Sequence, residues 1–350
     1  MRPSAASAQP RGSLLQSSPW TVVMPNMAEP YGRTRRALLN KPGVLLAADH
    51  EPGILGHVTG EAFSAPAVGG QSYVERPPVP ALRELASSVW VQQVGRDAAP
   101  YVHRRIPNGA VELVCRVGSA PQVIGPLTEP LVEVLEPGTT VVGMRFVPGA
   151  FPAVAGQPAS EVVGLALDAE ELWGRSAAAL GEAVGTAASP QEALAAVQLH
   201  VHERANAGEP PDPLVSEAVR GLMPWRTADV ASLTASLYIS ETQLRRRCRT
   251  AVGLAPKALH RMLRFQGFLA LVQQAIAQGR APTDDGLALL AVRAGYADQS
   301  HLTRECVRLT GVSPRVFLAE THQACACGHD HSASFAPVLR AETETRLTRE

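Results

Sequence analysis

The feature that most constrains the fold is an internal repeat near the C-terminus, in which the same residue types recur 58 positions apart. The first copy contains Leu244, Cys248, Gly253 and Pro256, and the second contains Leu302, Cys306, Gly311 and Pro314. Tyr238 and Tyr296 also match at this spacing. In each copy, an apolar helix and a short turn precede a polar helix that ends at Gly-x-x-Pro. The repeat therefore predicts two helix-turn-helix units.

The second helix of each unit carries polar and basic side chains, with Ser240 and Asp298 as the expected N-caps. A helix fits the major groove, and arginine offers two donors to guanine. The residues that we expect to contact DNA bases are Thr242, Arg245 and Arg246 in the first unit and Ser300, His301, Thr303 and Arg304 in the second, and Gln243 is a further expected DNA-binding residue. Arg249, Lys257 and Arg308 are expected to bind phosphates.

Two readers on one chain can enter successive major-groove turns about 34 Å apart. The segment between them, Met262–Val272, has apolar residues at helical spacing and is expected to be a rigid connecting helix. Residues 212–320 contain 14 lysines and arginines against 9 aspartates and glutamates, a net charge of +5 in a chain whose total is zero. This asymmetry favours double-stranded DNA as the partner, with solvated helix faces as the alternative interpretation.

Motifs in both units resemble the DNA-binding domain of AraC/XylS-type regulators over residues 226–320. They are Ser240-x-x-x-Leu244-x-Arg246, Gly253-Leu-x-Pro256-Lys257 and Leu263-Arg-Phe265 in the first half, and Gly295-Tyr-x-Asp-Gln-Ser-His-Leu-x-Arg304, Thr310-Gly-Val-Ser-Pro314 and Phe317 in the second. The resemblance implies a seven-helix, two-reader domain and transcriptional control. It also implies an unidentified small-molecule effector, with RNA polymerase and a second copy of the chain as candidate partners.

Several residues depart from this family pattern, among them Thr234, which stands where alanine is usual. Cys248 and Cys306 stand where each reader usually has phenylalanine, and both are expected to face the core as small hydrophobes. The alternatives are a reactive thiol at Cys248, activated by neighbouring arginines, and a redox switch formed by Cys248 and Cys306. Tyr238 replaces the usual turn glycine of the first unit, and a positive φ there would cost about 1 kcal/mol. The first unit is therefore the weaker match.

Upstream of residue 212, short β segments recur about every ten residues and predict a small sandwich or barrel, hence an α+β fold. The expected strands are Val89–Val94, Val111–Val117, Val132–Leu135 and Thr139–Phe146, and the expected helices are Ser160–Val163, Asp168–Trp173 and Pro190–Glu203. Tyr101–Arg105 is interpreted as a solvated strand end, with the wall of a ligand pocket as the alternative.

The chain is expected to divide into four segments. These are a low-complexity extension over 1–72, a β-rich sensor or dimerisation domain with trailing helices over 73–211, the double helix-turn-helix domain over 212–320, and a Cys/His tail over 321–350. The second segment resembles, more weakly, the N-terminal domains of some AraC regulators. The residues concerned are Arg105-x-Pro107-Asn108-Gly109, Gly143-x-Arg145-Phe146-x-Pro148-Gly149, Gly156-x-Pro158-Ala159 and Leu172-Trp173-Gly174.

The tail places four metal-ligating residue types at every second position, Cys325, Cys327, His329 and His331. Thiolate and imidazole together suit Zn²⁺ or Cu(I). A tail that carries these residues without binding metal is the alternative. The rival to DNA binding is therefore a metal- or thiol-responsive binding protein.

Other classes of protein receive no support from the sequence. No apolar run approaches the roughly 18 residues that a membrane span needs, and no secretory signal is visible. Five cysteines do not suggest a disulfide framework. We therefore expect a cytoplasmic protein without a membrane partner. The chain also lacks a phosphate-binding loop, a nucleophile elbow, an H-E-x-x-H motif and a paired-carboxylate site, so we expect no enzymatic activity.

Overall fold

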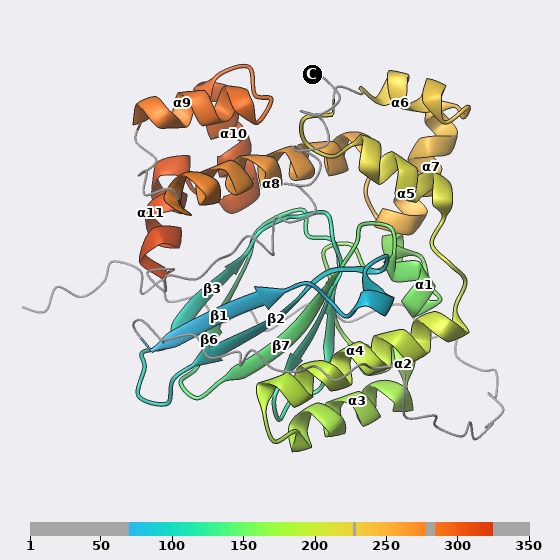
Figure 1. The fold of residues 1–350 in the computed structure, drawn as a ribbon, viewed down its shortest axis with the longest axis vertical. Coiled ribbons are helices and arrows are strands. Elements are labelled where there is room, and N and C mark those ends of the chain that lie inside the picture. The colour runs from blue at the N-terminus through green and yellow to red at the C-terminus, as the bar shows by residue number, and fades with distance from the viewer. Residues whose placement is uncertain (1–69, 227–228, 278–283, 325–350) are drawn as a thin grey trace, which may run out of the picture. The chain divides into compact units, whose positions relative to one another are not determined.

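The computed structural model describes residues 70–226, 229–277 and 284–324 (Figure 1). Residues 70–208 form a β-rich region, and residues 213–324 form a helical region. The predicted metal ligands Cys325, Cys327, His329 and His331 lie outside the described residues, as does nearly all of the predicted extension. The first strand begins at Gln71, inside the segment 1–72.

The β-rich region is built from antiparallel strands, which are β1 (Gln71–Arg76), β2 (Ala86–Val94), β3 (Tyr101–Arg105), β4 (Glu112–Arg116), β5 (Gln122–Ile124), β6 (Leu131–Leu135), β7 (Thr140–Phe146) and β8 (Ala166–Asp168). In the described part, one sheet has the order β1-β2-β7-β4-β5-β8, and β3 pairs with β6 in a second sheet. The strands predicted from the sequence correspond to β2, β4, β6 and β7.

Successive side chains of β2 point to opposite faces of the larger sheet, as in any strand. Val89 and Val91 pack in a core shared with helices, whereas Trp90 and Val94 pack in a second core shared with Leu135 of the smaller sheet. The larger sheet is therefore covered by helices on one face and by β3 and β6 on the other. This arrangement, followed by the helical region, confirms the predicted α+β class.

The helices of the β-rich region are η1 (Pro80–Leu82), α1 (Phe151–Ala155), η2 (Ala159–Glu161), α2 (Ala169–Trp173), α3 (Arg175–Thr186) and α4 (Pro190–Ala207). Helix α4 packs on β7 and β2, with α3 packed against α4. Ser189 caps α4, accepting from the Glu192 amide at 3.2 Å, and Leu194 and Val197 on its inner face are buried. This amphipathic pattern made α4 predictable.

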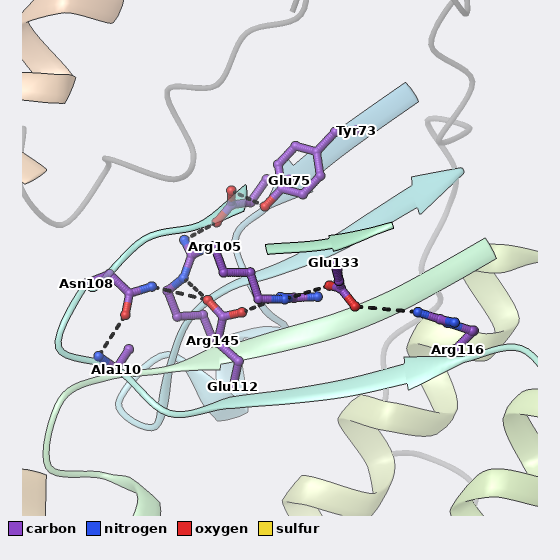
Figure 2. Close-up of polar contacts among 9 residues, drawn as sticks. All are labelled: Tyr73, Glu75, Arg105, Asn108, Ala110, Glu112, Arg116, Glu133 and Arg145. Atoms are coloured by element: carbon purple, nitrogen blue, oxygen red, sulfur yellow. Dashed lines mark hydrogen bonds and ion pairs between the residues drawn. The ribbon is translucent and has the colours of Figure 1, made fainter. Parts of the chain in front are cut away.

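A network of ion pairs lies beside the second core (Figure 2), in which Glu75, Arg105 and Glu112 are buried and Arg145 and Glu133 are half-buried. Arg145 Nη1 lies 2.8 Å from Glu75 and its Nε 2.8 Å from Glu112. Arg105 donates to Glu112 and Glu133, both at 2.9 Å. Because Arg105 is buried on β3, the interpretation of Tyr101–Arg105 as a solvated strand end is wrong: Glu112 and Glu133 compensate its charge inside the sandwich.

The charges of this network set the ionisation of its central carboxyl group. Burial is the largest influence and would raise the pKa of Glu112. The positive charges of Arg145 and Arg105, together with hydrogen bonds from Arg145 and Asn108, outweigh burial and lower the pKa to about 2. Glu112 is therefore ionised at neutral pH.

The helical region comprises α5 (Pro213–Gly221), α6 (Val230–Ser236), α7 (Glu241–Val252), α8 (Pro256–Ala277), α9 (Asp284–Arg293), α10 (Gln299–Thr310) and α11 (Pro314–Ala324). One apolar cluster, which runs from Val215 to Leu309, holds these helices together. Phe265 and Phe268 of α8 lie in this cluster and are fully buried. The prediction of a connecting helix over Met262–Val272 is confirmed by α8.

Candidate nucleic-acid interface

The first helix pair consists of α6 and α7. Ser240 caps α7 by accepting a hydrogen bond from the Gln243 amide at 3.2 Å, and the Gln243 side chain accepts from the Ser240 amide at 2.9 Å. This capping box fixes where α7 begins. Leu244 and Cys248 on the inner face of α7 are both 0% exposed. The opposite face of α7 therefore points away from the core.

The outer face of α7 carries most of the predicted contact residues of the first pair. Thr242, Arg245, Arg246 and Arg249 are exposed on α7, and Lys257 is exposed at the start of α8.

Two polar side chains of α7 have partners within the chain. Gln243 is exposed, but its side chain is engaged in the capping box. The neighbouring Arg247 lies 2.5 Å from the Asp212 carboxylate, so its guanidinium faces the start of α5.

The second helix pair consists of α9 and α10. Asp298 caps α10 by accepting from the His301 amide at 2.6 Å. Leu302 and Cys306 are 0% exposed, as are their counterparts on α7. Helices α7 and α10 begin 58 residues apart, at Glu241 and Gln299, and end 58 residues apart, at Val252 and Thr310. The sequence repeat is therefore a structural repeat.

The predicted contact residues of α10 differ in how exposed they are. Ser300, Arg304 and Arg308 are exposed. His301 and Thr303 are half-buried. The centroids of the His301 and Tyr296 rings lie 5.2 Å apart in a T-shaped arrangement, and the Thr303 hydroxyl donates to the Gln299 carbonyl at 2.9 Å.

The turns of the two pairs differ by one residue. Tyr238 has φ +54° in the first turn, and Gly295 has φ +83° in the second. Ile239 N–H donates to the Thr234 carbonyl at 3.2 Å, and Tyr296 N–H donates to the Ala291 carbonyl at 3.0 Å. Tyr238 therefore corresponds to Gly295, and Ile239 to Tyr296.

The match of Tyr238 with Tyr296 at the spacing of 58 is wrong in structural terms. Tyr296 is 3% exposed and packs in the core, whereas Tyr238 is 95% exposed. The second turn is one residue longer, so the register of 58 holds in α7 and α10 and is lost in the turns. The expectation of a positive φ at Tyr238 is confirmed.

The cysteines of α7 and α10 are core residues, as predicted. Burial raises the pKa of the Cys248 thiol to about 11, with a further contribution from the Asp212 carboxylate. Burial likewise raises the pKa of Cys306 to about 11. Neither group is an accessible thiolate at neutral pH, so the alternative of a reactive thiol at Cys248 is wrong.

Helix α8 connects the two pairs, which lie toward opposite ends of it in Figure 1. The Arg264 guanidinium donates to the Gly295 carbonyl at 3.2 Å and lies over the Tyr296 ring at 5.1 Å. Arg261 lies 3.2 Å from Glu305 of α10. Both contacts fix the second pair on α8.

The β-rich region contacts α7 and α10 at the same end. Arg104 of β3 donates to the Thr310 carbonyl at the C-terminus of α10, at 3.0 Å. Helix α7 packs on η2, and a Cβ placed on Gly253 would lie 3.0 Å from the Ala159 carbonyl oxygen. Gly253 and Thr310 stand at the C-terminal ends of two helices related by the repeat.

Two further properties concern the described ranges alone. Within 70–226, 229–277 and 284–324, no cluster of three or more His, Cys, Asp or Glu side chains is arranged to hold a metal ion. None of the helices in these ranges is both long and apolar enough to cross a membrane.

Comparison with known proteins gives matches to both regions. Residues 233–320 match a family described as a helix-turn-helix domain, and residues 74–168 match a family described as a domain of unknown function. No curated protein sequence matches the chain.

Solved structures of ToxT from Vibrio cholerae are also similar to the chain. An apo variant from strain SCE256 is 12% identical with a TM-score of 0.34, and the protein from strain O395 has the same values. The O395 protein bound to (E)-4-(8-methylnaphthalen-1-yl)but-3-enoic acid is 11% identical with a TM-score of 0.38. Each match covers 71% of this chain, and 97%, 96% and 98% of the respective ToxT chains.

The family match over 233–320 includes both helix pairs, and the motifs in that segment are those of AraC/XylS-type regulators. The chain therefore carries an AraC-type helix-turn-helix domain, the DNA-binding module of transcription regulators. This domain lies C-terminal to the segment 74–168, which matches the family described as a domain of unknown function.

Proposed function

We propose that the chain is a sequence-specific transcription regulator that inserts α7 and α10 into two successive major-groove segments of double-stranded DNA. One observation carries the proposal. The two helices share one repeat register, bury Leu244, Cys248, Leu302 and Cys306 in one core, and turn their basic faces outward. One packed core thus presents two helices of the kind that fits the groove.

The predicted contact residues divide chiefly into base readers and phosphate contacts. Arg245, Arg246 and Arg304 are the proposed base readers, since arginine pairs with two acceptors of guanine. Thr242, Ser300, His301 and Thr303 are assigned smaller contributions, because single hydroxyl or imidazole groups offer fewer bonds. Arg249, Lys257 and Arg308 are the proposed phosphate contacts, and Gln243 acts chiefly through its cap on α7.

The β-rich region is the proposed sensor. It contacts the C-terminal ends of α7 and α10, so a small molecule or a second copy of the chain that displaces β3 or η2 would reorient both helices. RNA polymerase is a further proposed partner for activation.

Selection of bound fragments from a random DNA pool by the purified full chain tests the function. We expect a recurring pair of short motifs about one helical turn apart and a Kd that rises steeply with salt. Combined replacement of Arg245, Arg246 and Arg304 by alanine should abolish enrichment while the circular-dichroism spectrum stays unchanged. Enrichment that survives this variant would contradict the proposal.

The Cys/His tail supplies a separate prediction. Metal content measured by mass spectrometry should fall on removal of residues 321–350 if Cys325, Cys327, His329 and His331 bind Zn²⁺ or Cu(I). DNA selection by the truncated chain then separates a metal-dependent regulator from a metal-independent one.

A further inference from the structure

Tyr238 combines two features that no packing role explains. Its backbone has φ +54°, in the left-handed region that a side chain disfavours, and the residue is 95% exposed. The Cβ of Tyr238 therefore strains the turn, and the exposed ring returns no burial. Large aromatic side chains on soluble proteins are usually at least half-buried, so a bare tyrosine at a strained position indicates an outward role.

The second helix pair shows that the turn needs no side chain here. Gly295 occupies the corresponding position, and the same pair of backbone hydrogen bonds closes the turn. In the first pair, Tyr238 N–H donates to the Ala235 carbonyl at 3.3 Å; in the second, Gly295 N–H donates to the Val292 carbonyl at 3.0 Å. Glycine would adopt this conformation without strain.

The position of Tyr238 places it next to the proposed groove-entering end of α7. It precedes the N-cap Ser240 by two residues. The N-terminal residues of a recognition helix contact base edges, so the turn before it lies beside the sugar–phosphate backbone that borders the groove. Arg245 and Arg246, both exposed, follow on the same helix and favour a negatively charged partner.

We infer that Tyr238 is a DNA-backbone contact that donates its phenolic hydroxyl to a phosphate at the edge of the groove entered by α7. Tyrosine is one of the side chains that makes such contacts. The inference rests on the proposed function and adds a contact that the second pair lacks. The backbone strain at Tyr238 is then explained by the contact that its hydroxyl makes with DNA.

Two substitutions test the inference on the full chain and its selected DNA. Tyr238→Phe removes only the hydroxyl and should weaken binding by about three- to tenfold, the range of one net hydrogen bond. Tyr238→Gly should weaken binding at least as much and raise the Tm, because the strained side chain is gone. A neutral donor releases no counterion, so the salt slope should stay unchanged in both variants.

The outcomes separate this inference from the function on which it rests. Unchanged affinity in both variants, with a loss in Arg246→Ala, would overturn the role of Tyr238 and leave DNA binding intact. The role of Tyr238 would also be overturned if Tyr238→Phe binds as tightly as the wild type, because the hydroxyl would then make no contact. It would be overturned as well if Tyr238→Gly lowers the Tm, because the ring would then be structural. A wild-type chain that selects no DNA would overturn both.

Discussion

Two arginines of the β-rich region and two arginines on the outer faces of α7 and α10 serve opposite purposes. Arg105 and Arg145 lie between strands and pair with buried carboxylates. Arg246 and Arg304 stand on helices whose inner faces are fully buried and whose outer faces are open. The same type of side chain is thus held by carboxylates inside the sandwich and exposed on the outer faces of α7 and α10.

The difference shows that location, rather than residue type, separates structural from functional charge. A buried arginine whose partners are also buried cannot leave them without a large penalty. An exposed arginine contributes little to folding and keeps its donors for a ligand. Substitution of the paired arginines should therefore lower the free energy of unfolding, whereas substitution of the exposed arginines should weaken DNA binding and leave the free energy of unfolding nearly unchanged.

The largest effect is expected for Arg145→Met. The change leaves Glu75 without its 2.8 Å partner inside the sandwich and should lower the free energy of unfolding by about 3–5 kcal/mol. Arg246→Ala, the matched control, should change it by no more than about 0.5 kcal/mol. Urea unfolding measures both, and equal losses would erase the distinction between the regions.

A loss of DNA binding rather than of stability is expected for Arg304→Ala on α10. It should cost about 1–3 kcal/mol of binding free energy to the selected DNA and relax the preference at one base pair, because a two-donor contact to a base is lost. Arg220→Ala, an exposed change on α5, is the control and should leave affinity unchanged. An Arg304 variant with wild-type affinity and preference would remove this residue from the readers.

Acid should weaken the β-rich region through His103 of β3. Burial, followed by the positive charge of Arg105, lowers the pKa of His103 to about 3, with Arg145 adding to this and Glu112 opposing it. The folded state thus favours the neutral ring, so its stability is complete above pH 6.5 and falls as pH drops toward 3. We expect a loss of about 1–2 kcal/mol between pH 7 and pH 5.

Unfolding by urea at both pH values measures this loss. His103→Gln should reduce the difference by the share of His103, because glutamine does not titrate, and leave the shares of His200 and His260, whose pKa values burial also lowers. A wild-type protein equally stable at pH 7 and pH 5 would mean that His103 is open to solvent.

The smallest effect is expected for Arg249→Ala on α7. Loss of one phosphate contact should weaken binding to all DNA sequences alike and reduce the slope of log K against log salt by about one. Gel shifts at several salt concentrations give the slope. A change confined to one sequence would instead make Arg249 a base reader.

The helical region was largely predictable from the sequence because its signals are local. Caps at Ser240 and Asp298, apolar residues at helical spacing and the glycine stops lie within a few residues of the features that they define. The repeat added register, which placed α7 and α10. It failed in the turns, where a one-residue difference moves Tyr238 opposite Gly295.

The β-rich region was predictable only where strands are apolar. Strand β3 contains two arginines, and Arg105 is buried because Glu112 and Glu133 meet it from other strands. Such pairing depends on sheet topology, which the order of residues does not reveal. The contact between Arg104 and Thr310, 206 residues apart, was likewise beyond local pattern.

Hydroxyl-radical footprinting of the full chain on its selected DNA tests most directly whether α7 and α10 read successive turns of one duplex. We predict two protected blocks on one face, about 10 base pairs apart, with only one of them lost in Arg304→Ala combined with His301→Ala. A single protected block shorter than one helical turn, unchanged in that variant, would contradict the account.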